Sequence, residues 1–218
     1  MEQIRNILET IKSTSKEVIP FQDNGDFHHN SPYKHGLSIL KNGILINAHQ
    51  SEHGVIRPTH VEVHGSTLPI DTANGNEKIS LARMVGEIPY YGQDTEYNSY
   101  DSRLVDFVVS EQLQKDGFFG RSYKNYYNEY LVPRDIPRSY IKNLDVRFHN
   151  MSLLKDTPCF YYGMTKELFI ENYNHFIDMA RFIVDENLSI PIREVINNQV
   201  VYILDQEKVA SLEKVKIR

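Results

Sequence analysis

The chain has 218 residues, of which 40% are hydrophobic and 24% charged, so it can bury one substantial core and lacks the composition of a disordered protein. Its formal net charge of -5 gives no overall electrostatic reason to bind nucleic acid or an anionic membrane, although a local basic groove is compatible with that average. A single cysteine, Cys159, excludes an internal disulfide, and we interpret it as a small buried residue.

Residues 1–20 predict an amphipathic helix, with Ile4, Ile7, Leu8 and Ile11 on one face. This segment does not have the pattern of a cleavable signal peptide. No stretch of the chain approaches the roughly 20 consecutive apolar residues of a membrane span. We therefore expect a cytoplasmic protein without a membrane partner, and delivery into a target cell without a cleavable signal is compatible with this pattern.

Residues 27–30, FHHN, predict a short strand, and the segment SPYKHGLSILKNGIL that follows predicts a helix. Ser31 is the expected N-cap, Pro32 suits the first helical position, and Gly43 suits the end of the helix. The histidines of FHHN are therefore expected just before a helix begins.

The rest of the chain alternates between loops and short apolar segments. Strands are predicted over residues 78–85, 129–132, 139–148 and 199–204, and a long helix over residues 165–187 with Thr165 as its N-cap. Residues 103–113 fit either a helix or a strand, because a short apolar run does not separate the two.

Residues 49–76 predict loop and edge strand, and residues 87–101 predict another loop, because Gly, Pro, His and Tyr interrupt regular periodicity there. We expect residues 1–155 to form a core that includes the N-terminal helix. Residues 156–218 are expected to form a helical extension packed on that core.

Three short blocks in this order resemble the signature of the ADP-ribosyltransferase fold, in particular its diphtheria-toxin and poly(ADP-ribose)-polymerase branch. They are FHHNSPYKHGLSILKNGI, ISLAR and YNEYLVPRDIPRSYI, and the likeness covers roughly residues 25–148. The resemblance implies an α+β fold with an ADP-ribosyltransferase-like split β-sheet core and flanking helices. It also implies that Glu129 is the catalytic glutamate and that His29 is the family histidine.

The resemblance implies NAD as the substrate. Cleavage of the bond between nicotinamide and ribose passes through an oxocarbenium-like state, which a fixed carboxylate such as Glu129 would stabilise. His29 would donate a hydrogen bond to the adenosine-side ribose. The other residues expected to bind NAD are Asn30 and Ser31 near the nicotinamide amide, Ser80 in the middle block, Arg83 at the pyrophosphate, and Tyr90 and Tyr91, or Tyr97 and Tyr100, beside the nicotinamide ring.

The acceptor is expected to be a macromolecule, either protein or nucleic acid. Many members that modify arginine or asparagine carry Glu or Gln two residues before the catalytic glutamate, and Tyr127 at that position disfavours them. By analogy, the chain would attach one ADP-ribose as a toxin, secreted effector or defence enzyme, for which an antitoxin or immunity protein is a further partner.

Three other interpretations remain open. His60, Glu62 and His64 share one face of a predicted strand, so a zinc-dependent hydrolase is one alternative. An NAD-dependent RNA 2′-phosphotransferase is another, since it shares the architecture. The third is a catalytically silent ADP-ribosyltransferase-like module that binds a partner.

Overall fold

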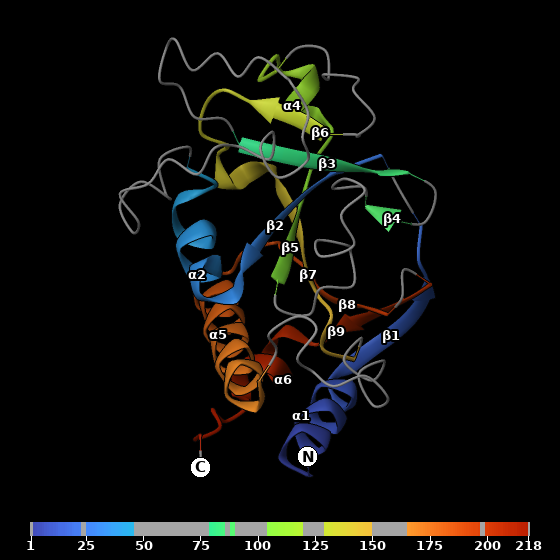
Figure 1. Ribbon diagram of the computed structural model, residues 1–218, viewed down its shortest axis with the longest axis vertical. Helices are drawn as coiled ribbons and strands as arrows, with labels where there is room; N and C mark the ends of the chain where they lie inside the picture. Colours follow the sequence, from blue (N-terminus) through green and yellow to red (C-terminus); the bar gives the residue numbers. More distant parts are fainter. Residues whose placement is uncertain are drawn as a thin grey trace.

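The computed structural model describes residues 2–22, 25–45, 79–85, 88–89, 104–119, 129–149, 165–196 and 199–217. These residues form a mixed α+β fold in which two helices pack side by side against a twisted sheet (Figure 1). The α+β class expected from the sequence is confirmed.

The helices differ widely in length, and the longest one lies in the C-terminal third. The helical elements are α1 (Glu2–Ser13), α2 (Tyr33–Asn42), α4 (Gln112–Lys115), the 3₁₀ helix Arg138–Tyr140, α5 (Lys166–Asp185) and α6 (Gln206–Ser211).

The strands of the described part of the chain belong to one nine-stranded sheet with the order β1-β9-β8-β7-β5-β2-β3-β4, and β6 pairs with β3 beside this path. All the pairings are antiparallel except that of β7 with β8, which lie on either side of α5 in the sequence. The strands are β1 (Ser15–Pro20), β2 (Phe27–Pro32), β3 (Ile79–Val85), β4 (Ile88–Pro89), β5 (Leu104–Val109), β6 (Glu129–Val132), β7 (Ile141–Val146), β8 (Ile192–Ile196) and β9 (Val200–Leu204).

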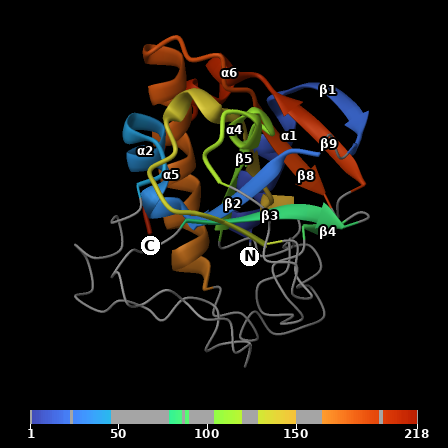
Figure 2. The same cartoon turned by 90° about the horizontal axis from the view of Figure 1, so that it is seen from above.

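Helices α2 and α5 lie against the same face of the sheet, as a second view shows (Figure 2). Phe148, just after β7, is fully buried and its ring contacts the rings of Phe169, Tyr173 and Phe176 on α5. Burial of each such aromatic side chain contributes about 1.5 to 3 kcal/mol. This apolar layer holds the central strands in place.

Several sequence predictions are confirmed. The long helix is α5, and the Thr165 hydroxyl accepts a hydrogen bond from the Leu168 backbone N–H as the expected N-cap. The predicted strands correspond to β3, β6, β7 and β9. The undecided segment, residues 103–113, contains strand β5 followed by the start of α4.

Two predictions at the N-terminal end are wrong. The first helix ends at Ser13, and β1 follows instead of further helix, because the extended segment around Val18 pairs with β9. Ser31 is not an N-cap. It lies inside β2, where it pairs with Val105, and α2 begins only at Tyr33.

The C-terminal segment contains strands as well as helices. Besides α5 and α6, it contributes β8 and β9 to the sheet, and β9 also pairs with β1 near the N-terminus. The segment is therefore not purely helical. The expected division near residue 155 stays a prediction.

Candidate active site

Strand pairing brings Glu129 and His28 into one row across three strands. Ala82 of β3 pairs directly with His28 of β2 on one side and with Glu129 of β6 on the other. Residues that pair directly across antiparallel strands share a face of the sheet. With strands about 4.8 Å apart, the backbones of His28 and Glu129 lie about 10 Å from each other in this row.

The other candidate residues divide between the two faces because side chains alternate along a strand. Asn30 lies two positions after His28, and Ser80 two positions before Ala82, so both take positions on the face of the row that holds Glu129. His29, Ser31 and Arg83 take the alternate positions: they pair with Phe107, Val105 and Phe27 respectively. The register thus groups His28, rather than His29, with Glu129.

Several expected residues lie outside the described residues. They are Tyr90 and Tyr91, Tyr97 and Tyr100, the His60, Glu62 and His64 group, and Cys159.

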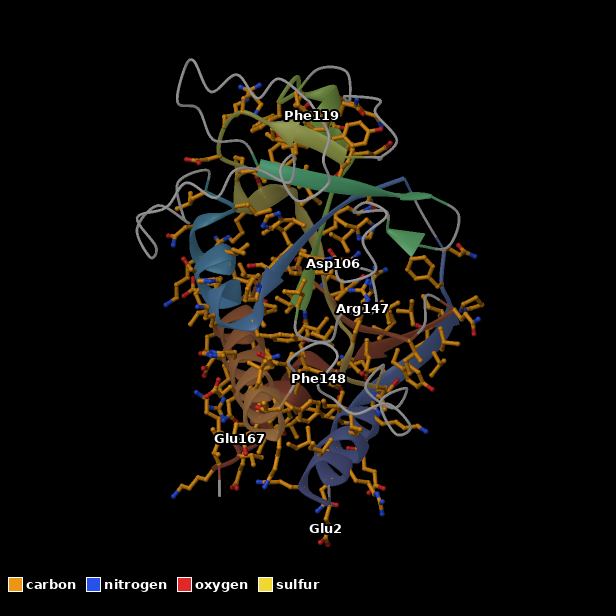
Figure 3. The ribbon with its side chains drawn as sticks, viewed as in Figure 1. Glu2, Asp106, Phe119, Arg147, Phe148 and Glu167 are labelled. Carbon is orange, nitrogen blue, oxygen red and sulfur yellow. The ribbon has the colours of Figure 1, made fainter. Side chains whose placement is uncertain are left out.

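A buried polar cluster occupies the same face, on strands next to the row. His28 Nδ1 lies 2.7 Å from Asp106 Oδ2 of β5, and Arg147 Nη2 lies 3.4 Å from the same oxygen. Figure 3 labels Asp106 and Arg147, which lie near each other in the middle of the molecule. His28 is 4% exposed, Asp106 is fully buried, and Arg147 is 2% exposed. A carboxylate buried this deeply is tolerated because two cationic or hydrogen-bonding groups contact it.

The contacts in this cluster shift the titration of both partners. Burial raises the pKa of Asp106, but the His28 charge and hydrogen bond, together with Arg147, outweigh burial and lower that pKa to about 2. Burial likewise opposes the charged form of His28, but attraction and hydrogen bonding to Asp106 outweigh it and raise the pKa of His28 above 6.5. Asp106 is therefore ionised at neutral pH and accepts the hydrogen bond, so Nδ1 of His28 donates it.

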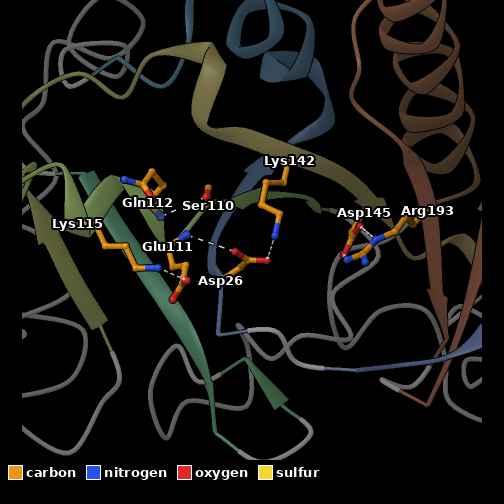
Figure 4. Close-up of polar contacts among 8 residues, drawn as sticks. All are labelled: Asp26, Ser110, Glu111, Gln112, Lys115, Lys142, Asp145 and Arg193. Carbon is orange, nitrogen blue, oxygen red and sulfur yellow. Dashed lines mark hydrogen bonds and ion pairs between the residues drawn. The ribbon is translucent and has the colours of Figure 1, made fainter.

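The polar face continues from β5 onto β7 and β8. Arg193 donates from Nε and Nη2 to the two carboxylate oxygens of Asp145, each at 2.7 Å, in a bidentate ion pair (Figure 4). Asp26 accepts a hydrogen bond of 2.6 Å from Lys142 Nζ and one of 3.3 Å from the Glu111 backbone N–H. Because each of these pairs joins one carboxylate to one cationic side chain, the pairs add little net charge to this face of the sheet.

A shallow, partly open depression begins at His28, and its cavity volume of about 10 Å³ corresponds to roughly one water molecule. Val108 and Asn143, which continue the row of His28 onto β5 and β7, line the depression together with Arg193. The remaining lining residues are Phe21, Gln22 and Asp26. His28 therefore stands between this depression and the row position of Glu129.

Three buried atoms of this face have no hydrogen-bond partner among the described residues: Asn30 Oδ1, Asp106 Oδ1 and Arg147 Nε. Such groups cost free energy unless they are paired. The face therefore has donor and acceptor capacity for a polar ligand or for water.

Sequence reasoning missed Asp106. The signal was present, because a single carboxylate stands inside the apolar run LVDFVV, and a charged residue in a buried strand requires a partner. The partner is separated from it by 78 residues, however, so only the fold identifies His28 as that partner.

Within the described ranges, no group of three or more His, Cys, Asp or Glu side chains is arranged to hold a metal ion. In the same ranges, no helix combines the length and hydrophobicity that crossing a bilayer requires.

No protein-family model matches the sequence, and no curated protein matches it significantly. Among solved structures, one similar chain is Thermosipho africanus DarTG in complex with ADP-ribose, at 14% identity and a TM-score of 0.36. The match covers 89% of this chain and 53% of the DarTG chain, so this chain spans about half the length of that protein. A likeness this distant establishes neither a shared fold nor a shared activity.

Proposed function

We propose that the chain is an NAD-dependent mono-ADP-ribosyltransferase that transfers ADP-ribose to a macromolecular acceptor. The observation that supports this proposal is the register: Ala82 pairs with both His28 and Glu129. A glutamate and a histidine at paired positions of one sheet, about 10 Å apart at the backbone, suit contacts to two parts of one extended dinucleotide.

Glu129 is the proposed catalytic residue. It begins a strand whose pairing with β3 supplies a rigid base for a group that must hold a developing positive charge. Its carboxylate would stabilise the oxocarbenium-like ribose and orient the acceptor. His28 is the proposed contact to the adenosine-side ribose, with Asn30 and Ser80 on the same face as further candidates for NAD contacts. Arg83, Ser31, Tyr90 and Tyr91 stay predictions from the resemblance.

Glu129→Gln tests the catalytic assignment. The change removes a charge with little change of shape, so the variant should stay folded while transfer of label from NAD to acceptors in a lysate falls roughly a hundredfold or more. Glu171→Gln is the matched control because Glu171 is exposed on α5. Transfer by Glu129→Gln at the rate of this control would refute the assignment. The labelled fraction, protein, RNA or DNA, identifies the acceptor.

A comparison of His28→Ala with His29→Ala tests whether NAD contacts the histidine that is in register with Glu129. Loss of a hydrogen bond at the ribose should weaken NAD binding about tenfold in His28→Ala, measured by calorimetry on variants with a native circular dichroism spectrum. His29→Ala should bind NAD within about twofold of the wild type. Weakened binding in His29→Ala alone would restore His29 to the role that the resemblance implies.

A further inference from the structure

Among the described residues, the ring of His28 is hydrogen-bonded through Nδ1 to Asp106. Its Nδ1 lies 2.7 Å from Asp106 Oδ2, a distance typical of a charge-assisted hydrogen bond. We propose that Asp106 is a positioning residue that fixes the ring of His28 through Nδ1, so that Nε2 is the nitrogen presented to the ribose of the dinucleotide. This inference rests on the proposed function, and it names a residue that acts through another instead of touching NAD.

The strand register explains how Asp106 reaches the ring. Asp106 pairs directly with Asn30, two residues after His28, so the carboxylate and the imidazole are diagonal neighbours on adjacent strands. Diagonal neighbours on one face lie within reach of long side chains. The two backbones are held by the β2 and β5 ladder, which pairs all six residues of β2. The hydrogen bond is therefore built on a rigid support.

Arg147 and His28 together keep Asp106 in the ionised form that this role requires, against the opposing effect of burial. The arginine lies 3.4 Å from the oxygen that His28 contacts, so it restrains the carboxylate and favours its ionised state. A neutral acid at this position would be able to donate to Nδ1 and select the other tautomer. An ionised Asp106 only accepts, so Nδ1 keeps its proton.

Nε2 is the ring nitrogen of His28 that a ligand would contact. Because Nδ1 is engaged, a ligand meets His28 at Nε2, which donates when the ring is charged and accepts when it is neutral. His28 is also one wall of the depression that Asn143 and Arg193 line. The ring is thus anchored at Nδ1 and borders this small depression of about 10 Å³.

The experiment compares Asp106→Asn with Asp145→Asn. Both changes neutralise a fully buried carboxylate of the same face, but Asp145 is bound to Arg193 rather than to His28. Two readouts are taken: the tautomer and pKa of the His28 imidazole by ¹⁵N NMR, assigned with His28→Gln, and the KM and kcat for NAD.

The expected result separates the two variants. In Asp106→Asn the pKa of His28 should fall and the KM for NAD should rise about tenfold, with a kcat changed less than about threefold. In Asp145→Asn the Nδ1–H tautomer should persist and the KM should stay within about threefold of the wild type. Asp106→Glu, which keeps the charge but moves it, should restore a raised pKa without restoring the KM.

An unchanged KM in Asp106→Asn, with an altered pKa of His28, would overturn the inference while leaving the proposed transferase activity intact. If the variants fail to fold, NMR measurements on His28 of the wild type test the inference. A neutral Nε2–H tautomer of His28, or His28 resonances that do not move when NAD or ADP-ribose is added, would overturn the inference. Absence of NAD cleavage by the wild type, with His28 shifts on adding ADP-ribose, would instead refute the proposed function.

Discussion

His28 and Asp106 link the stability of the protein to pH. The pKa of Asp106 is lowered from 3.8 to about 2, so its contribution is present above pH 3.8 and is lost as the pH falls toward 2. The pKa of His28 is raised above 6.5, so its contribution is present below pH 6.5 and is lost as the pH rises through the folded-state value. Charged groups that influence the ring come from several elements, namely Asp106, Asp145 and Arg147.

We therefore expect the free energy of unfolding, measured with urea, to decrease between pH 6.5 and 8.5 in the wild type. His28→Gln should show a smaller decrease over the same range, since it lacks the titrating ring. Equal slopes for the two proteins would mean that His28 has the same pKa in the folded and unfolded states.

At the scale of single residues, the adjacent histidines His28 and His29 differ in a property that the sequence does not contain, namely the face of β2 to which each belongs. The motif FHHNSP predicts that an imidazole belongs to the site, and it correctly indicates a strand there. It does not say which of two adjacent histidines shares a face with Glu129, because a shift of one residue exchanges the faces of a strand. The answer depends on pairing with Ala82, about 50 residues further along the chain.

At the scale of elements, the junction after α2 is a backbone contact that only glycine permits. Gly43 has a φ of +83°. Ile44 exchanges backbone hydrogen bonds of 2.9 Å with Ile136, which follows β6. A Cβ at Gly43 would collide with the Ile136 carbonyl oxygen and come within 3.0 Å of the Arg138 N. This junction ties the end of α2 to the segment that follows the strand of Glu129.

Gly43→Ala should lower the free energy of unfolding by about 2 to 4 kcal/mol, because it combines an unfavourable φ with a backbone collision. Gly117→Ala is the control: its φ is +75°, but nothing lies within 4 Å of the added Cβ. It should cost only about 1 to 2 kcal/mol. Urea denaturation of both variants measures the difference, and equal costs would show that the chain at Ile136 moves away without penalty.

Helix boundaries followed from sequence where local chemistry determines them. Thr165 caps α5 through its own hydroxyl, and Gly43 ends α2 by its conformation. The start of α2 was missed because the ladder with β5 holds Ser31 and Pro32 in an extended conformation. The hydrogen bonds of that ladder override a capping preference worth about 1 kcal/mol.

At the scale of the whole molecule, the sheet separates two environments. On one face, α2 and α5 bury an apolar layer that includes Phe107, Leu144 and Phe148. The other face carries most of the buried ionic groups, among them His28, Asp106, Asp145 and Arg147, whereas Glu194 of β8 is buried at an alternate position and contacts His149. Charged groups are costly to bury unless they are paired, so we interpret the face on which most of them gather as the candidate functional side of the sheet.

Periodicity, capping residues and composition were enough to predict an α+β protein, most of its strands and its longest helix, because these signals act between residues a few positions apart. The same signals placed Glu129 at the start of a strand. Contacts between distant segments decided the rest: the pairing of β1 with β9, the row that joins His28 to Glu129, and the carboxylate of Asp106 beside the imidazole. Strand register is set by the packing of the whole sheet, and a short motif contains no information about the strand that will lie next to it.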